Sequence, residues 1–305
     1  MEYLHSLFDV KLDEPTAVTV GKFDGIHKGH HILTSDIIEK NNSGLKSCLI
    51  TFTNSVRKAI SNDDSPALIT NKERMHMLES NGLNYLIECP FDERLMQTDA
   101  DNFIKLLVTN LNMKYMVVGS DFTFGYKGAG NVALLTELSK KYGFELKIIE
   151  KIQKNNRDIS STYIREELKE GHIESVNDML GYEYFVWGEV VHGAHLGTKI
   201  GIPTINITPE ASKLVPKFGV YVTTIDFDGR LYHGVTNVGT KPSVSDKNIV
   251  GIETHILDYN GDLYGKFVKV IFQAFLRPEM KFNSVEELKE QMSKDKIVAK
   301  DFFNK

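Results

Sequence analysis

Two histidines follow a glycine-rich turn near the N-terminus, in the run Gly21-Lys22-Phe23-Asp24-Gly25-Ile26-His27-Lys28-Gly29-His30. An apolar stretch ending at Val20 precedes the turn and a helical pattern follows it, so the turn joins a strand to a helix. Such a junction presents backbone N–H groups and the positive end of a helix dipole, which suits the phosphates of a nucleotide. Because His27 and His30 are three residues apart, both imidazoles lie on one helix face. The run therefore predicts a phosphate site at which two imidazoles stabilise charge.

Simpler roles for these residues stay open, because glycine turns between strands and helices are common and His-x-Gly-His is a short motif. Asp24 could simply cap the helix. The flanking glycines strengthen the nucleotide interpretation, since they enclose an aromatic residue and a carboxylate in a loop that we expect to be too short to belong to the core. The candidate ligand-binding residues of this turn, beside the two histidines, are Gly21, Phe23, Asp24, Gly25 and Gly29.

A second cluster of polar residues lies in the run 197–206, which reads Gly-Thr-Lys-Ile-Gly-Ile-Pro-Thr-Ile-Asn. In an extended segment Thr204 and Asn206 point to the same side. A hydroxyl and an amide oxygen side by side can bind a hard cation such as Mg²⁺, which takes phosphate oxygens as further ligands. Lys199 could meet one of these phosphates. The alternative is an ordinary turn, in which Pro, Thr and Asn are common.

A carboxylate and an imidazole alternate with apolar residues further on, in the run Gly251-Ile252-Glu253-Thr254-His255-Ile256-Leu257-Asp258. Alternation along a strand puts Glu253 and His255 on one face. A carboxylate near a nucleotide–magnesium site can deprotonate an attacking hydroxyl in phosphoryl transfer. Taken alone, Glu253 could equally be a solvent-facing residue.

The first half of the chain alternates strand and helix patterns, which predicts a parallel sheet covered on both faces. In such sheets ligands bind at the carboxyl ends of the strands, where the histidine turn and the run Gly119-Ser120-Asp121 would both lie. The expected strands are Ala17–Val20, Ser47–Phe52, Tyr85–Cys89, Tyr115–Gly119 and Glu145–Ile149. The expected helices run from His27 to about Lys40, from near Asn71, from near Asp101, and from Val132 to Tyr142 with a stop at Gly143.

The second half of the chain has a different order of helix and strand patterns. A helix opens at Ser160-Ser161-Thr162 and a short helix ends at Leu180. From Tyr184 onward strand patterns follow one another, with Asp228-Gly229 and Asn260-Gly261 as expected hairpin turns, which predicts a small antiparallel barrel. A helix from about Ser284 to Phe302 closes the chain, and Ser284 with Glu287 forms an expected capping box. We place the domain boundary between residues 182 and 183.

Size and composition describe an ordinary globular protein of two domains, with 305 residues, 41% hydrophobic residues and 25% charged residues. The net charge is −5 without a dense basic run, so nucleic acid is not an expected partner. The two cysteines, Cys48 and Cys89, have no metal-ligand spacing and predict neither a disulfide framework nor a zinc site. The start has no signal-peptide pattern and no apolar run is long enough for a bilayer, so we expect a cytoplasmic protein without a membrane partner.

The ordered set of motifs resembles the bifunctional prokaryotic riboflavin kinase/FAD synthetase family over essentially the whole chain. The segments that carry the resemblance are Gly21–His30, Gly119-Ser120-Asp121-Phe122-Thr123-Phe124-Gly125, Ile159-Ser160-Ser161-Thr162-Tyr163-Ile164-Arg165, Gly201-Ile202-Pro203-Thr204-Ile205-Asn206, Glu253–Asp258 and Asp262-Leu263-Tyr264-Gly265. Each is moderately specific, and six in this order are very specific. The resemblance implies an N-terminal nucleotidyltransferase-type domain (1–182) and a C-terminal riboflavin kinase barrel (183–305).

The resemblance implies two ATP-dependent reactions. The barrel would convert riboflavin and ATP to FMN and ADP, and the first domain would convert FMN and ATP to FAD and pyrophosphate. His27 and His30 would stabilise the ATP phosphates. Ser161, Thr162 and Arg165 resemble a second phosphate-binding motif, in which Arg165 offsets charge on the pyrophosphate. Asp121, or the backbone near it, would lie in the FMN or ATP pocket.

In the barrel, the same resemblance makes Thr204 and Asn206 the ligands of Mg-ATP and Glu253 the general base that activates the ribityl hydroxyl. Arg277 and the C-terminal helix resemble the region that closes over the flavin.

Two segments depart from the family pattern. Thr51-Phe52-Thr53-Asn54-Ser55-Val56 replaces the usual Thr-Phe-Asp-Pro-His-Pro, and Pro242-Ser243-Val244 replaces Pro-Thr-Phe. The first change flanks the adenylyltransferase site. It raises the alternative of a riboflavin kinase whose adenylyltransferase half is weak or silent. A flavin-binding regulator without turnover is a third hypothesis, but a binder needs no general base.

Overall fold

The computed structural model describes residues 1–53, 66–193, 197, 201–241 and 249–304. It divides into two compact units, Met1–Ser161 and Thr162–Lys305. The fold class expected from the sequence is confirmed: a parallel α/β sheet precedes a closed antiparallel barrel with a C-terminal helix. The boundary between residues 182 and 183 stays a prediction about the division of function.

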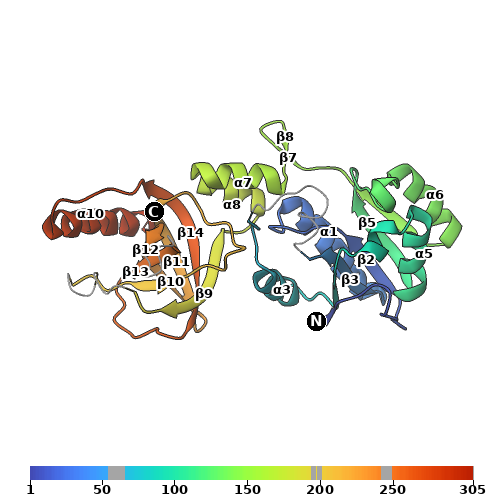
Figure 1. Ribbon diagram of the computed structural model, residues 1–305, viewed down its shortest axis with the longest axis horizontal. Coiled ribbons are helices and arrows are strands. Elements are labelled where there is room, and N and C mark those ends of the chain that lie inside the picture. Colours follow the sequence, from blue (N-terminus) through green and yellow to red (C-terminus); the bar gives the residue numbers. More distant parts are fainter. Residues whose placement is uncertain (54–65, 194–196, 198–200, 242–248, 305) are drawn as a thin grey trace. The chain divides into compact units, whose positions relative to one another are not determined.

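The first unit is built on a six-stranded sheet with the order β1-β4-β3-β2-β5-β6 (Figure 1). The strands are β1 (Glu2–Leu4), β2 (Thr16–Val20), β3 (Lys46–Phe52), β4 (Tyr85–Cys89), β5 (Met113–Gly119) and β6 (Glu145–Ile149). All neighbouring pairs are parallel. The chain leaves β2 on one side toward β3 and β4, then returns to the other side of β2 as β5. The switch point therefore lies between the carboxyl ends of β2 and β5, where parallel sheets bind ligands.

Helices cover both faces of this sheet (Figure 1). The longer helices are α1 (Lys28–Glu39), α3 (Asn71–Ser80), α5 (Ala100–Asn110) and α6 (Val132–Tyr142). The shorter elements are η1 (Lys40–Ser43), α4 (Glu93–Gln97), η2 (Tyr126–Gly128), β7 (Gln153–Lys154) and β8 (Arg157–Asp158). Strand residues alternate between two cores: Leu49 and Tyr115 pack with α1 and α3, whereas Ile50 and Met116 pack with α5 and α6. The sequence periodicity predicted this arrangement because alternate strand residues face opposite sides.

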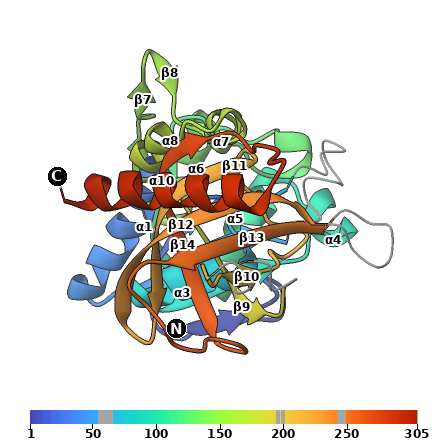
Figure 2. The same cartoon turned by 90° about the vertical axis from the view of Figure 1, so that its left-hand side faces the viewer.

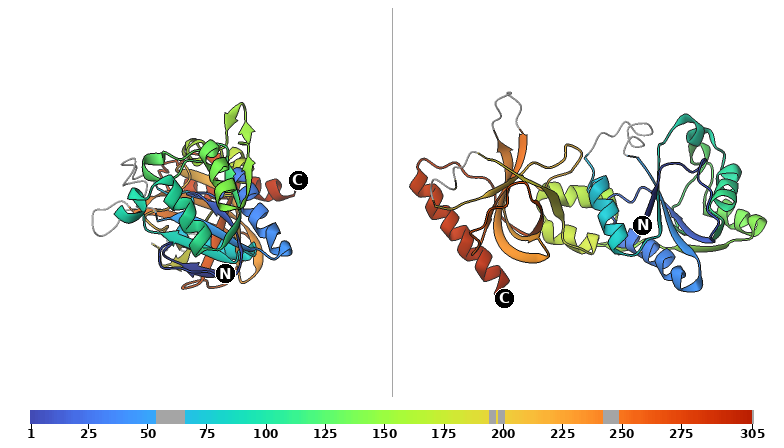
Figure 3. Two further views of the ribbon diagram at one scale, coloured as in Figure 1. Left: turned by 90° about the vertical axis from the view of Figure 1, so that its right-hand side faces the viewer. Right: turned by 90° about the horizontal axis from the view of Figure 1, so that it is seen from below.

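The second unit begins with two helices and continues as the barrel (Figure 3). The helices are α7 (Ser161–Glu170), whose first residue belongs to the first unit, and α8 (Ile173–Leu180). The barrel strands are β9 (Phe185–Val191), β10 (Ile205–Ile207), β11 (Gly219–Phe227), β12 (Arg230–Lys241), β13 (Ile249–Ile256) and β14 (Phe267–Arg277). They close in the order β10-β13-β12-β11-β14-β9. Closure leaves no open edge in the sheet.

The inside and the outside of the barrel are distinguished by three buried threonines. The Thr236 hydroxyl lies 2.7 Å from that of Thr223 and 2.8 Å from that of Thr254, and all three side chains are fully buried. Residues that alternate with them along β12 and β13 therefore face outward. On the outer face, α10 (Val285–Phe303) lies across the barrel (Figure 2). Ala299 of this helix packs against Val222.

The two expected hairpins have different outcomes. Asp228 and Gly229, with φ of 50° and 72°, join β11 directly to β12, as predicted. The prediction for Asn260-Gly261 is wrong: β13 pairs with β12 and β10, whereas β14 pairs with β11 and β9. A sequence shows the turn residues but not the partners that barrel closure assigns to the strands on either side.

The expected capping box at the start of α10 is present only in part. The Ser284 hydroxyl accepts the Glu287 N–H at 3.1 Å, but the Glu287 carboxylate accepts the N–H of Asn283 at 2.8 Å instead of that of Ser284. Among the residues the structure describes, no helix combines the length and the apolar character that crossing a membrane requires.

Candidate active sites

The histidine turn follows β2 directly, at the carboxyl end of the sheet. Phe23, Gly25 and Ile26 all have positive φ, of 46°, 84° and 39°. This conformation is costly for Phe and Ile, and such strain persists where the surroundings over-determine it. Here the packing of the Phe23 and Ile26 side chains holds the turn in place, because both are fully buried in the core on the α1 side. The expectation that this loop is too short to belong to the core is therefore wrong.

Asp24 connects the turn to two distant segments. Its side chain is buried and Oδ1 accepts the N–H of Leu68 at 2.9 Å. Its carbonyl oxygen accepts the Ser161 hydroxyl at 2.8 Å. The alternative that Asp24 caps the following helix is wrong, because His27 is the N-cap residue of α1 and no side chain caps it. A helix N-terminus of this kind presents backbone N–H groups that suit an anionic ligand.

His27 and His30 stack on one another, with ring centroids 3.7 Å apart and planes at 19°. His27 is buried and His30 is partly buried, and within the described part of the chain the buried Nδ1 atom of each has no hydrogen-bond partner. Burial lowers the pKa of His27 to about 4, although Asp24 acts in the opposite direction. Burial, with His27 and His31 nearby, holds the pKa of His30 well below its usual value. Both imidazoles are therefore neutral at pH 7, so each has one ring nitrogen that can donate a hydrogen bond and one that can accept a hydrogen bond.

The other candidate residues of the first site lie at helix and strand ends. Gly21 and Gly29 flank the turn, and the ring of His27 lies 3.3 Å from where a Cβ of Gly29 would be. Asp121 follows β5, is largely exposed, and pairs with Lys151 at 2.9 Å. Ser161 begins α7, whereas Thr162 and Arg165 lie further along this helix in the second unit, with Arg165 buried.

In the barrel, the structure brings Thr204 and Glu253 together from segments that are distant in sequence. The Thr204 hydroxyl donates to Oε1 of Glu253 at 2.6 Å. Asn206 of β10 lies directly opposite Glu253 of β13. Thr254 next to Glu253 points into the barrel, so these polar side chains lie on its outer face. His255 shares this face, and its Nδ1 lies 2.8 Å from the carbonyl oxygen of Pro203.

The oxygen donors of this cluster fit a hard cation. Asn206 is buried, and a Cβ at Gly193 would overlap its amide, so a glycine is required where the chain passes this side chain. A hydroxyl, an amide and a carboxylate are ligands that suit Mg²⁺ when phosphates and water complete its coordination. Among the described residues there is no group of three or more His, Cys, Asp or Glu side chains arranged to hold a metal ion.

Two predicted features of the sites fall outside the described residues: Lys199, and the positions Asn54-Ser55-Val56 of the first departure from the family pattern. The second departure, Pro242-Ser243-Val244, falls outside them as well.

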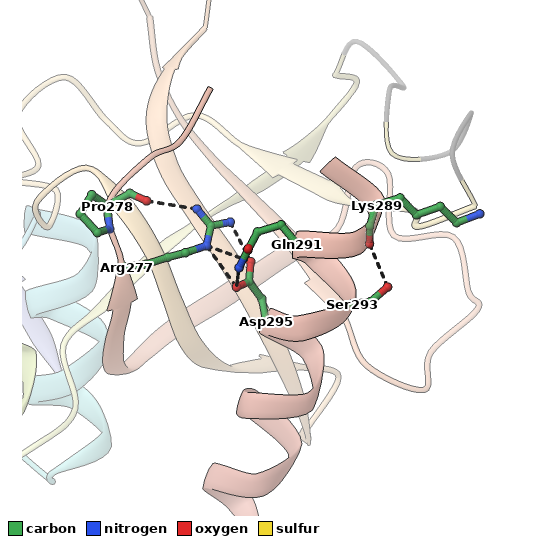
Figure 4. A network of polar contacts seen from close by, with 6 residues as sticks. All are labelled: Arg277, Pro278, Lys289, Gln291, Ser293 and Asp295. Carbon is green, nitrogen blue, oxygen red and sulfur yellow. Dashed lines mark hydrogen bonds and ion pairs between the residues drawn. The ribbon is translucent and has the colours of Figure 1, made fainter. Parts of the chain in front are cut away.

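Arg277 ends β14 and is held by the C-terminal helix (Figure 4). Its Nε lies 3.1 and 3.2 Å from the two carboxylate oxygens of Asp295, and its Nη2 lies 2.7 Å from Oδ2. Gln291 also donates to Asp295, at 2.9 Å. Asp295 is buried and Arg277 nearly so. The guanidinium therefore anchors α10 to the barrel, an engagement that the sequence did not predict.

Two family models match the chain in succession. The model described as FAD synthetase matches residues 9–163, and the model described as riboflavin kinase matches residues 180–303. A bifunctional riboflavin kinase/FMN adenylyltransferase from Escherichia coli (strain K12) is 34% identical over 95% of this chain and 93% of the relative. A protein of the same name from Buchnera aphidicola subsp. Schizaphis graminum is 36% identical over 96% of both chains.

A solved structure from Streptococcus pneumoniae, described as a macrolide-efflux protein, has a TM-score of 0.86 and 28% sequence identity to this chain. The match covers 98% of both chains. The combination of the two units in one chain is therefore shared with a solved structure.

Proposed function

Because this chain belongs to the bifunctional riboflavin kinase/FMN adenylyltransferase family, we propose that it phosphorylates riboflavin to FMN and adenylates FMN to FAD, with ATP as co-substrate of both reactions. The observation that carries the proposal is that each family model matches a unit with its own polar cluster at the expected motif. Both models name flavin enzymes, so we favour flavin chemistry over the efflux role in the name of the Streptococcus pneumoniae structure.

In the first unit, the histidine turn would bind the phosphates of ATP. The phosphate oxygens would accept hydrogen bonds from the imidazoles of His27 and His30 and from N–H groups at the start of α1. The FMN phosphate would then attack the α-phosphorus of ATP, and pyrophosphate would leave. Donors that are already in place stabilise the charge of this transition state without reorganisation. Ser161, Thr162 and Arg165 would form a second phosphate-binding motif, in which Arg165 would offset charge on the leaving pyrophosphate. Asp121, or the backbone near it, would lie in the FMN or ATP pocket.

In the barrel, Glu253 would act as the general base. Its carboxylate would take the proton of the terminal ribityl hydroxyl while that oxygen attacks the γ-phosphorus of ATP, and ADP would leave. The hydrogen bond from Thr204 fixes one carboxylate oxygen, so the other oxygen is available for the substrate proton. We propose that the N-terminal function extends to residue 182 and the kinase begins at residue 183, close to residue 180, where the riboflavin kinase match begins.

Thr204 and Asn206 would hold Mg²⁺ together with the phosphates of ATP, and Lys199 would contact a phosphate. The support is the donor chemistry, because hydroxyl and amide oxygens are hard ligands. When bound, the ion would neutralise charge on the phosphates during transfer. Arg277 would act at the flavin side of the kinase through its hold on α10. The two free, buried cysteines are in keeping with a reducing compartment such as the cytoplasm.

The test is a product assay. Purified protein is incubated with riboflavin, ATP and Mg²⁺, and FMN and FAD are separated by chromatography with fluorescence detection; a parallel reaction starts from FMN. We expect FAD from both. If FMN accumulates and FAD never forms, the chain is a riboflavin kinase with a silent first unit. If flavin binds tightly and no ATP is consumed, the chain is a flavin-binding regulator and the proposal fails.

A further inference from the structure

A lysine that belongs to none of the sequence motifs lies between two carboxylates at the carboxyl end of the first unit's sheet. Lys151 follows β6 by two residues, and its ammonium lies 2.9 Å from Oδ2 of Asp121 and 3.3 Å from Oδ2 of Asp158. Asp121 belongs to the run that follows β5, and Asp158 ends β8. The hydrogen bond to Asp121, with a second to Asp158, raises the pKa of Lys151, so the ammonium is charged at neutral pH.

Two contacts set the orientation of the Asp121 carboxylate. Oδ2 pairs with Lys151, and Oδ1 lies 3.1 Å from where a Cβ of Gly119 would be, so the carboxylate folds back over the end of β5. The backbone beneath it forms a turn, in which the N–H of Phe122 donates to the carbonyl oxygen of Gly119 at 3.1 Å. A turn fixes the backbone of a residue but leaves its side chain a choice of rotamers. Lys151 therefore supplies the contact that selects one of them.

The same lysine connects the Asp121 turn with the histidine turn. Asp158 holds Lys151 from the other side and also accepts Nε2 of Gln153 across the β7–β8 hairpin, at 2.9 Å. Three residues after Asp158, the Ser161 hydroxyl donates to the carbonyl oxygen of Asp24 at 2.8 Å. Lys151 is thus one member of a set of contacts that extends from the end of β5 to the proposed phosphate site.

We propose that Lys151 is a positioning residue for the adenylyltransferase reaction, which holds the carboxylate of Asp121 in the orientation that binds substrate. This inference rests on the proposed function of the first unit, and it gives the pocket role to the side chain of Asp121 and not to the backbone near it. An ionised carboxylate only accepts hydrogen bonds. Its partner is therefore a hydroxyl or an N–H group of the flavin or of the nucleotide, and not a phosphate.

The exposure of this ion pair separates positioning from stability. The side chains of Lys151 and Asp121 are 39% and 65% exposed, and exposed ion pairs contribute little to the free energy of folding. A bound substrate would exclude water from the pair, which strengthens its electrostatic interaction. Loss of the Lys151 ammonium should therefore leave the fold intact and weaken substrate binding.

The experiment is a double-mutant cycle on FAD formation from supplied FMN, in which the KM for FMN and the KM for ATP are measured separately in the full-length protein. Lys151→Met should raise the KM of the one substrate that Asp121 binds by about fivefold, as for one hydrogen bond, with kcat unchanged within about twofold. Asp121→Ala should raise the same KM. Lys151→Met added to Asp121→Ala should change nothing further, because two residues that act through one contact are not additive.

Two further variants show what the lysine supplies. Lys151→Arg keeps the cation and should restore most of the wild-type KM. The matched control is Lys141→Met, because Lys141 forms an ion pair of the same kind, with Asp101 at 2.6 Å, between α6 and α5. We expect neither KM to change in this control. FMN formation from riboflavin, which uses the other unit, and the circular dichroism spectrum should match wild type in every variant.

Three results would show that the inference is wrong. If Lys151→Met still raises a KM in the Asp121→Ala background, the lysine contacts the substrate itself. If Asp121→Ala changes neither KM, the side chain of Asp121 has no role in the pocket. If Lys151→Met changes neither KM, the lysine does not position the carboxylate; should this variant not fold, Lys151→Gln decides by the same criterion. A wild-type protein that forms no FAD would refute the proposed adenylyltransferase function, and this inference with it.

Discussion

The two candidate sites gather their polar groups in different ways. In the first unit, the histidines, the strained turn and the helix N-terminus come from ten consecutive residues, 21–30. In the barrel, Thr204 and Glu253 are 49 positions apart and meet because β10 and β13 pair in one register. The first site is therefore a local motif positioned by a sheet, whereas the second is created by strand pairing.

The sites also differ in how their polar atoms are satisfied. The Nδ1 atoms of His27 and His30 are buried and have no partner among the described residues, and each such atom costs about 1–3 kcal/mol. Glu253 already accepts a hydrogen bond from Thr204. The comparison indicates that the first site is completed by its ligand, whereas the second is organised before a ligand arrives. The following measurements test this difference, from the largest expected effect to the smallest.

The largest effect is expected for Glu253→Ala. Loss of a general base costs about 10²–10⁴ in rate, so FMN formation from riboflavin should be abolished in practice. FAD formation from supplied FMN should persist, because it uses the other unit. Chromatographic product analysis of both reactions, with Glu253→Gln as the isosteric control, measures the effect. If either variant removed both activities while the protein stayed folded, the assignment of two separate sites would be wrong.

The opposite pattern is expected for His30→Ala. Removing one donor to the transition state costs about 10²–10³ in rate, here of FAD formation, while FMN formation from riboflavin should persist. Because His30 is partly buried and stacks on His27, His30→Gln keeps a polar group of comparable reach and separates lost chemistry from lost packing. Circular dichroism of each variant checks the fold. Robust FAD synthesis by both variants would contradict the role given to the histidine turn.

A third prediction concerns the anchor of α10. Asp295→Ala leaves the guanidinium of Arg277 without its carboxylate in a mostly buried position, and breaking such a pair by removing one partner costs about 3–5 kcal/mol. The double variant Arg277→Met with Asp295→Leu should recover part of this loss, because it buries no unpaired charge. Chemical denaturation of the full-length protein measures both. A double variant less stable than Asp295→Ala would show that the pair contributes more than mutual neutralisation.

The smallest effect is the pH dependence of stability that His27 of the first unit contributes. The pKa of His27 is about 4 in the folded chain and about 6.5 in an unfolded one. Between these values the unfolded chain binds more protons, so stability is lost as the pH falls from about 6.5 to about 4. The full loss from this residue is on the order of 3 kcal/mol.

The variant His27→Gln should lack this part of the acid sensitivity. Thermal unfolding at pH 7.5 and pH 5 measures it, and the quantity of interest is the difference between wild type and variant, which removes the contribution of other groups. If wild type and variant lost the same thermal stability on acidification, His27 would have the same pKa in the folded chain as in the unfolded one.

Much of the fold could be predicted from the sequence because the signals are local. Alternation of strand and helix patterns indicated the parallel sheet, and the stop at Gly143 is confirmed by its left-handed φ of 71°. The family motifs indicated both chemistries. Two predictions from the sequence are wrong: a hairpin at Asn260-Gly261, and a histidine turn that lies outside the core. A short window shows turn residues and polarity but not which strand pairs with which, nor what lies above a loop.

The sequence by itself determined the chemistry available to this protein: imidazoles at a helix N-terminus in one half, and a hydroxyl, amides and a carboxylate in the other. The tertiary structure alone decided which groups act together. Strand register placed Asn237 and Asn206 on the two sides of Glu253. Packing of α10 on the barrel placed Asp295 within hydrogen-bond distance of Arg277. The physical reason is that residue type is a property of the chain, whereas burial, pKa and hydrogen-bond partnership depend on neighbours that are brought close only by folding.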